Sequence, residues 1–227
     1  MTTHDVKTLV QRVVNVFETG TPEGRYDSLV VMPDGHNDSR QITYGRSQTT
    51  EQGHLKELLE LYVQKGGLLA GEIAAYFDRI GVVPLEDDAQ FKDLLRRAAR
   101  EDGIMRQAQD DFFDEVYFDP AMGFFQTNGF ILSLSLLVIY DSHIHSGSVP
   151  GFLRNRFPEP VPARNGNEKS WVTSYVNVRH DWLANHSNEL LRRTIYRTQC
   201  FKDQIATENW DLDKLPIMDN GVPVNVP

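Results

Sequence analysis

The sequence predicts a mainly helical α+β protein with one small β-hairpin. Three observations predict this fold class. Apolar residues recur at helical spacing along most of the chain, first over residues 6–17. Alternation typical of strands is confined to residues 26–32 and 41–44, and turn-forming residues separate these two segments. The most apolar stretch, residues 121–140, predicts a buried central helix.

The remaining elements follow from apolar periodicity and from chain breakers. A helix is expected to open at Thr50-Glu51, and residues 117–120 should break the helix before them because a residue that precedes proline avoids the α region. Residues 150–170 contain four prolines and predict an ordered loop or a linker, and residues 210–227 predict an extended tail. Further amphipathic helices are expected at residues 54–63, 71–80, 87–100, 102–116, 171–183 and 187–204.

Length and composition limit the classes of protein to which this chain can belong. The chain has 227 residues, of which 40% are apolar and 24% charged, so it is long enough for one large domain or two lobes. Its net charge of −9 argues against nucleic acid and anionic membranes as partners, because both require a basic surface. The single Cys200 excludes an intramolecular disulfide. The first 18 residues lack the pattern of a signal peptide.

Three acidic residues lie at junctions between elements rather than on a helix face. Glu18 ends the first helix, and Asp34 and Asp38 lie in the turn of the hairpin. A carboxylate at a helix C-terminus is slightly out of place, because that end favours cations. Solvated helix-terminal and turn-capping roles are the ordinary alternatives for these residues. A pair of carboxylates across a cleft is the apparatus that hydrolyses a glycosidic bond.

A further carboxylate, Asp141, follows the most apolar stretch and should therefore be buried, which requires a charged partner. Two nearby histidines, His143 and His145, could suggest a metal site with it. Residues two apart do not share a helix face, so neither a metal nor a cofactor is expected. The partners expected for Asp141 are arginines of the later helices, Arg179, Arg192, Arg193 and Arg197.

These residues resemble a known family. Phe17-Glu18-Thr19-Gly20-Thr21-Pro22-Glu23 is similar to the start of the catalytic core of family 46 chitosanases, and Ile42-Thr43-Tyr44-Gly45-Arg46 to the strand after their aspartate. Further matches are Gln107-Ala108-Gln109-Asp110, Val116-Tyr117-Phe118-Asp119-Pro120 and Tyr140-Asp141. The similarity covers most of residues 6–205.

The resemblance implies a lysozyme-like fold: a single catalytic domain, residues 1–227, of two helical lobes with a small β-hairpin or sheet that lines a substrate cleft. The minor lobe with the hairpin is expected at roughly residues 19–85. The implied activity is endo-hydrolysis of the β-1,4-glucosamine linkages of chitosan with inversion. Two alternatives remain: a muramidase that acts on peptidoglycan, and a non-catalytic polysaccharide-binding protein of the same fold.

The resemblance also implies roles for individual residues. Glu18 would be the general acid, and Thr43 would hold the attacking water. The general base is left open between two residues: counting forward from Glu18 by 16 residues selects Asp34, which we favour, whereas counting back from Thr43 by five selects Asp38. The family's buried Asp–Arg network is expected from Asp141, Arg179 and Arg193. The candidates for substrate binding are Arg40, Glu51, Asp110 and His145.

Chitosan is a polycation, so the acidic balance of the chain agrees with such a substrate. The expected partner is chitosan or a chito-oligosaccharide, and the protein is expected to be a monomer. The family resemblance implies secretion, whereas the sequence itself shows no signal peptide, which leaves a cytoplasmic location open.

Overall fold

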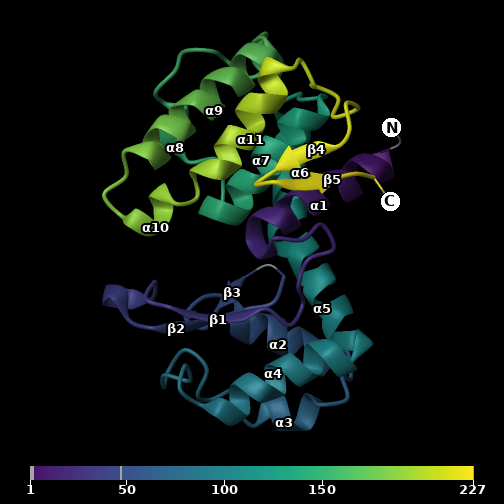
Figure 1. Ribbon diagram of the computed structural model, residues 1–227, viewed down its shortest axis with the longest axis vertical. Coiled ribbons are helices and arrows are strands. Elements are labelled where there is room, and N and C mark those ends of the chain that lie inside the picture. Colours follow the sequence, from purple (N-terminus) through teal and green to yellow (C-terminus); the bar gives the residue numbers. More distant parts are fainter. Residues whose placement is uncertain (1–2, 47, 227) are drawn as a thin grey trace. The chain divides into compact units, whose positions relative to one another are not determined.

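The computed structural model describes residues 3–46 and 48–226. The chain divides into two compact units (Figure 1). One comprises Met1–Glu23 and Val116–Pro227, and the other Gly24–Glu115. The second unit therefore extends past residue 85, where the sequence places the end of the minor lobe, and includes two further helices.

The unit Gly24–Glu115 begins with a three-stranded antiparallel sheet in the order β1-β2-β3. Val30 pairs with Thr43, and Thr43 pairs in turn with Thr50. The predicted hairpin is thereby confirmed. The elements are β1 (Leu29–Met32), η1 (His36–Asp38), β2 (Gln41–Tyr44), β3 (Thr49–Thr50), α2 (Leu55–Gln64), α3 (Ala70–Ala74), α4 (Ala89–Glu101) and α5 (Gly103–Phe113).

Two boundaries in this unit differ from prediction. The helix expected to open at Thr50-Glu51 starts at Leu55, because Thr50 continues the sheet and the Glu51 N–H donates to the carbonyl of Ile42. The helix expected over residues 71–80 ends at Ala74, and turns follow it. The first difference arises where a backbone hydrogen bond to another strand overrides local propensity, whereas the hydrogen bonds after Ala74 stay local, as from the N–H of Tyr76 to the carbonyl of Ile73.

Asp102 connects the helices of this unit through hydrogen bonds to its carboxylate. Its Oδ1 accepts a hydrogen bond from the N–H of Ile104 at 2.9 Å and so caps α5. Its Oδ2 accepts from the Tyr62 hydroxyl and from the N–H of Leu68, each at 2.7 Å. One buried carboxylate thus connects α2, the loop after it and α5, and these three bonds contribute to holding the pKa of Asp102 below its ordinary value although burial raises it.

The other unit is built around α7, in which ten consecutive residues from Leu134 to His143 are buried. α1, α6, α9 and α11 pack against it, and a β4-β5 hairpin lies along α1 and α11 (Figure 1). The elements are α1 (Thr3–Thr19), η2 (Asp114–Phe118), α6 (Asp119–Thr127), α7 (Ser133–Ser146), α8 (Gly151–Arg154), η3 (Pro162–Arg164), α9 (Glu168–Ala184), α10 (Glu189–Arg192), α11 (Ile195–Ala206), β4 (Ile217–Asp219) and β5 (Val222–Val224).

The prediction of one buried helix over residues 121–140 is wrong, because the chain breaks between α6 and α7. Gly129 has φ +75°, and a Cβ there would meet the backbone nitrogen of Ala163 at 3.0 Å. Beyond the break, the Glu168 carboxylate accepts hydrogen bonds from the N–H groups of Ile131 and Leu132 and from the Ser135 hydroxyl. A carboxylate from α9 therefore caps the first turn of α7.

Three smaller departures concern the rest of this unit. At residues 117–120 the chain does not leave the helical path: a π-helical turn leads into α6, and Pro120 occupies its first turn, where proline is tolerated. The helix expected over residues 187–204 is two helices, α10 and α11. The tail expected to be extended forms the β4-β5 hairpin.

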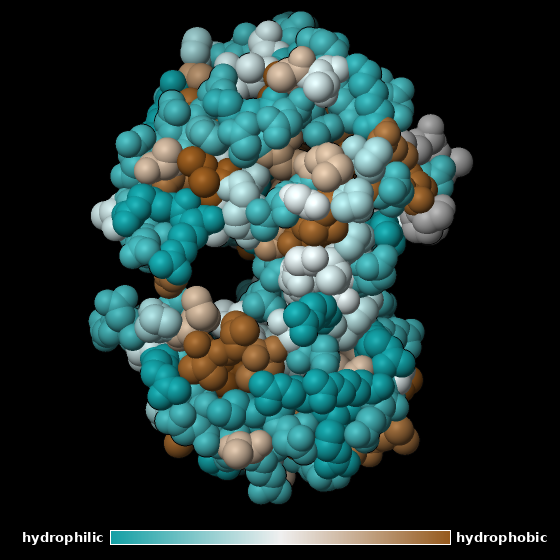
Figure 2. Space-filling model, in the orientation of Figure 1, coloured by the Kyte–Doolittle hydropathy of each residue, from teal (hydrophilic) through white to brown (hydrophobic). Residues whose placement is uncertain are grey.

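The visible surface is mainly hydrophilic, with separate apolar patches (Figure 2). The most exposed large apolar residues, Leu68, Val82 and Ile131, are far apart in sequence. Within the part of the chain that the structure describes, no helix combines the length and apolarity needed to cross a bilayer.

Candidate active site

Glu18 lies in the last turn of α1, directly after buried Phe17. Gly20, at φ +76°, ends the helix by donating its N–H to the carbonyl of Val16. α1 has no basic residue in its last turn. The cation that a helix C-terminus favours comes instead from α11, whose Arg197 forms an ion pair with Oε1 of Glu18. The Glu18 side chain is 10% exposed, so this pair is largely removed from water.

Arg197 also binds a second carboxylate. Its Nη1 donates to Oδ1 of Asp141 at 2.7 Å, and Nη1 of Arg179 lies 2.7 Å from the other oxygen, Oδ2. The side chains of these three residues are between 0% and 5% exposed. Four charged groups thus form a buried array in the order Glu18–Arg197–Asp141–Arg179. Two guanidiniums balance two carboxylates, which is the condition for burying charges at tolerable cost.

The packing of α7, α9 and α11 explains why these residues meet. Asp141 follows the apolar run of α7, so its carboxylate is carried into the core. Arg179 comes from α9 and donates to the Ser142 hydroxyl at 3.3 Å. Arg197 lies one helical turn before Phe201 on α11 and shares its buried face.

The structure confirms the predicted pairing of Asp141 with Arg179 but not the one with Arg193. Arg193 is 71% exposed and forms an ion pair with Glu189 at 2.6 Å, one turn away. It precedes α11, and Arg197 occupies the place expected for it. On one continuous helix Arg193, Arg197 and Phe201 would share a face, so it is the break between α10 and α11 that separates the two arginines.

The array drives the pKa values of its two carboxyl groups apart. Burial raises the pKa of Glu18 above its ordinary value, and the opposing effect of Arg197 does not cancel it. Asp141 is also buried, but Arg179 and Arg197 together hold its pKa below the usual range. One carboxyl group is thereby disposed to carry a proton and the other to stay ionised, which is the pattern of an acid and its supporting charge.

His145 lies near the end of α7, within the field of the same groups. Burial and the two arginines, Arg179 and Arg197, lower the pKa of His145 to about 3, so the imidazole is neutral near neutral pH. Its role in substrate binding stays a prediction. His143 is buried in the same turn. Among the described residues, no three of His, Cys, Asp and Glu form a cluster that could hold a metal ion.

The hairpin residues lie in the other unit. Asp34 is exposed, and its Oδ1 accepts a hydrogen bond from Nε2 of Gln41 at 3.0 Å. Gln41 and Thr43 are two apart on β2, so their side chains point to the same face of the sheet. Thr43 is 6% exposed, and its Oγ1 is buried without a hydrogen-bond partner among the described residues. The hydrogen bond from Gln41 therefore holds Asp34 at the face of β2 that also carries the unpaired hydroxyl of Thr43.

Asp38 lies at the tip of the same turn and is also exposed. Its φ of +58° and that of Asn37 at +55° fall in the left-handed region, which non-glycine residues rarely adopt and which is enriched at functional sites. The structure thus places both predicted bases in the β1–β2 turn.

Three residues predicted to bind substrate have protein partners. Both oxygens of Glu51 accept backbone hydrogen bonds, from the N–H groups of Ile42 and Leu85, so this buried carboxylate holds the sheet to the loop before α4. Its role as a substrate ligand stays a prediction. Arg40 is exposed and forms an ion pair with Asp87. Asp110 binds Arg46 at 2.7 Å and the Tyr26 hydroxyl at 2.8 Å, and 43% of its side chain stays exposed.

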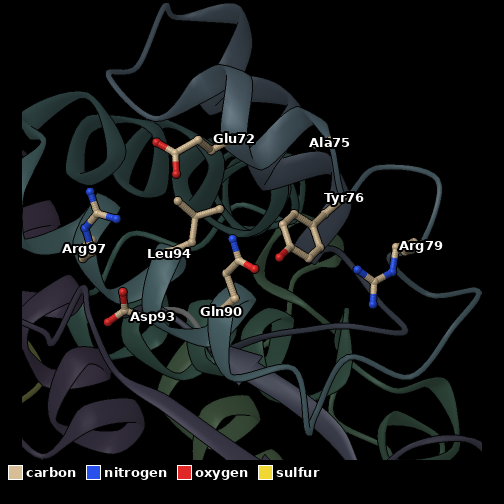
Figure 3. A pocket seen from close by; sticks show the side chains of 8 residues that line it. All are labelled: Glu72, Ala75, Tyr76, Arg79, Gln90, Asp93, Leu94 and Arg97. Carbon is tan, nitrogen blue, oxygen red and sulfur yellow. The ribbon is translucent and has the colours of Figure 1, made fainter.

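A separate hollow of about 440 Å³ lies between α3 and α4 (Figure 3). Tyr76 lines it and stacks on Phe91 beneath. The guanidiniums of Arg79 and Arg97 at its rim already pair with Asp88 and Glu101 outside it. No residue predicted from the sequence as functional lines this hollow.

A buried, proton-retaining carboxyl group supported by a charged network is the apparatus of an acid catalyst, and the comparisons with known proteins identify the class. The model of glycosyl hydrolase family 46 matches residues 12–217. The chain belongs to this family, and it is a glycoside hydrolase.

Individual relatives agree. The chain is 25% identical over 227 residues to a protein named chitosanase from Bacillus subtilis strain 168, with 92% of this chain and 80% of that protein covered. Among solved structures, a family 46 chitosanase from Gynuella sunshinyii in complex with chitotetraose superposes with a TM-score of 0.84 at 23% identity, covering 100% of this chain and 99% of that one. Native chitosanase from Bacillus subtilis MY002 gives 0.82 at 21%, with 99% and 100% covered. The predicted fold class is confirmed.

Replacing Arg197 with methionine should destabilise the protein, because two buried carboxylates lose a shared partner. Breaking a buried ion pair typically costs about 3–5 kcal/mol of unfolding free energy. Urea unfolding at pH 7 measures this loss. The matched control is Arg193→Met, whose exposed ion pair is screened by solvent and should cost far less stability. Equal losses for the two variants would contradict the described array.

Proposed function

We propose that the protein is an endo-acting chitosanase that hydrolyses β-1,4-linked glucosamine polymers with inversion at the anomeric carbon. Its membership of family 46 and the names of its relatives support the substrate class. The observation that carries the proposed chemistry is the state of Glu18: a nearly buried carboxyl group at a helix end, disposed by burial to keep its proton.

In this proposal Glu18 is the general acid. It protonates the glycosidic oxygen as the bond to the leaving sugar breaks, and its raised pKa keeps the acid form available at working pH. Donation leaves a carboxylate beside Arg197, which is already oriented by Asp141. The guanidinium therefore stabilises the charge that develops on Glu18 with no rearrangement of the array.

The general base in this proposal is a carboxylate of the β1–β2 turn, Asp34 or Asp38. An inverting hydrolase needs it about 6.5–9.5 Å from the acid, with room for the attacking water. The hydrogen bond from Gln41 to Asp34 and the unsatisfied hydroxyl of Thr43 on the same face of β2 support Asp34 as the base and Thr43 as the residue that holds the water. The left-handed backbone of Asp38 supports the alternative.

Charge supports a cationic substrate. The chain carries a net charge of −9, and the field of an acidic protein attracts protonated glucosamine units. Asp110 keeps part of its carboxylate exposed although Arg46 and Tyr26 bind it, so it is retained as a candidate ligand for a substrate ammonium group. Arg40, which is exposed beside Asp87, is retained as a polar contact in the same proposal.

The direct test of this function is a time-resolved proton NMR spectrum of a chito-oligosaccharide digest. Inversion at a β-linkage predicts that the first reducing ends are α anomers, which mutarotation later converts to the equilibrium mixture. Peptidoglycan is the comparison substrate for the alternative as a muramidase. First-formed β anomers, or cleavage of peptidoglycan and not of chitosan, would refute the proposal.

Replacing Glu18 with glutamine should abolish turnover, because an amide cannot donate the proton to the leaving oxygen. General acid catalysis contributes about 10²–10⁴-fold, so kcat should fall by at least the lower figure. Chitosan hydrolysis followed by reducing-end release measures this loss, and circular dichroism checks that the fold is retained. The substitution Asp5→Asn, of an acid in the first turn of the same helix, is the control. Turnover by Glu18→Gln at the wild-type rate would show that another residue is the acid.

The two candidate bases should respond differently to substitution by asparagine. Loss of the residue that deprotonates water should reduce kcat by about 10²–10⁴-fold, whereas loss of the other should leave most activity. The same assay on Asp34→Asn and Asp38→Asn distinguishes them. Equal, mild effects of both substitutions would mean that neither residue is the base and would defeat the inverting scheme.

A further inference from the structure

Gln52 lies in the connection between β3 and α2 and is an exposed polar residue that the reaction as proposed does not use. Both ends of its side-chain amide are bonded to the β1–β2 turn. Its Oε1 accepts a hydrogen bond from the N–H of His36 at 2.7 Å, and its Nε2 donates to the hydroxyl oxygen of Ser39 at 2.9 Å. Holding a long, exposed side chain in one geometry costs conformational entropy. Two bonds from such a side chain to one turn therefore invite a functional explanation.

The backbone between the two bonded residues has an uncommon conformation. His36 and Ser39 flank Asn37 and Asp38, whose φ angles of +55° and +58° fall in the left-handed region. Non-glycine residues keep such angles where the surrounding structure fixes them. The turn itself supplies a hydrogen bond from the Ser39 N–H to the His36 carbonyl at 3.2 Å. Gln52 adds two bonds from outside the turn, one on each side of the left-handed pair.

Gly35 leaves the space that the Gln52 side chain occupies. A Cβ at this position would lie 2.7 Å from Nε2 of Gln52 and 2.6 Å from Oγ of Ser39, both too close for a real contact. Its φ of −79° is open to any residue, so the need for glycine here is one of space. The glycine at position 35 and the long amide at position 52 therefore fit together.

The backbone of Gln52 is bonded toward the other candidate base. Its N–H donates to Oε1 of Gln41 at 3.0 Å, and Nε2 of Gln41 donates to Oδ1 of Asp34 at 3.0 Å. Because a backbone N–H can only donate, it fixes which end of the Gln41 amide faces the carboxylate. Gln41 is buried, and Glu51, directly before Gln52, accepts two backbone hydrogen bonds. Both neighbours of this connection are thus held in place.

We propose that Gln52 is a positioning residue for the general base. Its side chain holds the two residues that flank Asp38, and its N–H orients Asp34 through Gln41. Gln52 touches no reacting atom in this scheme and acts through the turn alone. Such positioning matters because a displacement of about 1 Å can cost about 10²-fold in rate. The inference rests on the proposed function, in which a carboxylate of the β1–β2 turn is the base.

The substitution Gln52→Ala tests the proposal, because it removes both side-chain bonds of an exposed residue and leaves its N–H in place. For chitosan hydrolysis, kcat should fall about tenfold while KM changes by less than about twofold, since substrate still binds and the base is misplaced. The conservative variant Gln52→Glu should restore most of the lost kcat. Its carboxylate still accepts from the His36 N–H, and the Ser39 hydroxyl can reverse its role and donate to it.

Gln90→Glu is the matched control, because it makes the same change of charge at an exposed position of α4 in the same unit. Its kcat and KM should equal those of the wild type. Ser39→Ala should reproduce part of the loss, and its addition to Gln52→Ala should cause little further loss, since the two residues share one bond. A wild-type kcat in Gln52→Ala, a loss that appears as a raised KM, or a Gln52→Glu variant as impaired as Gln52→Ala would overturn the proposal.

Amide hydrogen exchange, followed by NMR on the full chain, reads the same bonds without substrate. The His36 amide should exchange about tenfold faster in Gln52→Ala than in the wild type, because it loses its acceptor. Gln52→Glu and Gln90→Glu should both keep the wild-type rate. An equal rate in the wild type and in Gln52→Ala would show that Gln52 does not hold the turn and would also overturn the proposal.

The two readouts together separate this inference from the proposed function. Faster exchange of the His36 amide in Gln52→Ala with an unchanged kcat would refute the inference alone and assign these bonds a merely structural role. A wild-type protein that keeps this amide protected and never cleaves chitosan would refute the proposed function, and the inference with it.

Discussion

The shared guanidinium of Arg197 is the interaction on which the rest of the site depends. It binds Glu18 from α1 and Asp141 from α7 while its own backbone belongs to α11, so three helices that are distant in sequence meet at one cation. A cation that is almost wholly buried is tolerable only if its partners are fixed. The apolar run of α7 and the capping of its first turn by Glu168 supply that rigidity.

The packing of the array determines which of its carboxyl groups retains a proton. Glu18 and Asp141 are both carboxyl groups in the same core, yet their pKa values move in opposite directions, since Asp141 lies between two arginines and Glu18 contacts one. The same environment holds an acid ready to donate and a cation ready to receive the resulting charge.

The sequence predicted elements whose signals are local. The alternation of residues 41–44 marked β2 with its correct bounds, and the helix before Glu18 was evident from its apolar spacing. Features set by distant partners could not be predicted in this way. The break at Gly129 depends on the backbone of Ala163 and on Glu168, which lie more than 30 residues away.

Individual site residues show the same limit. Arg193 and Arg197 are equally plausible on a single long helix, and only the start of α11 at Ile195 decides between them. Glu51 was predicted as a candidate for substrate binding, and its hydrogen bonds from two backbone N–H groups of other segments could not be inferred from the sequence. The burial of Asp219 in β4 could not be predicted, because it follows from a hairpin in a tail that was expected only to be extended.

The most direct test of the central claim locates the proton itself. Neutron diffraction from a deuterated crystal at pH 4.5, the ordinary pKa of a glutamate, should show a deuteron on Glu18 at more than half occupancy and none on Asp141. A bare Glu18 carboxylate, or a deuteron on Asp141 instead, would contradict the account of an acid held in its protonated form by burial beside Arg197.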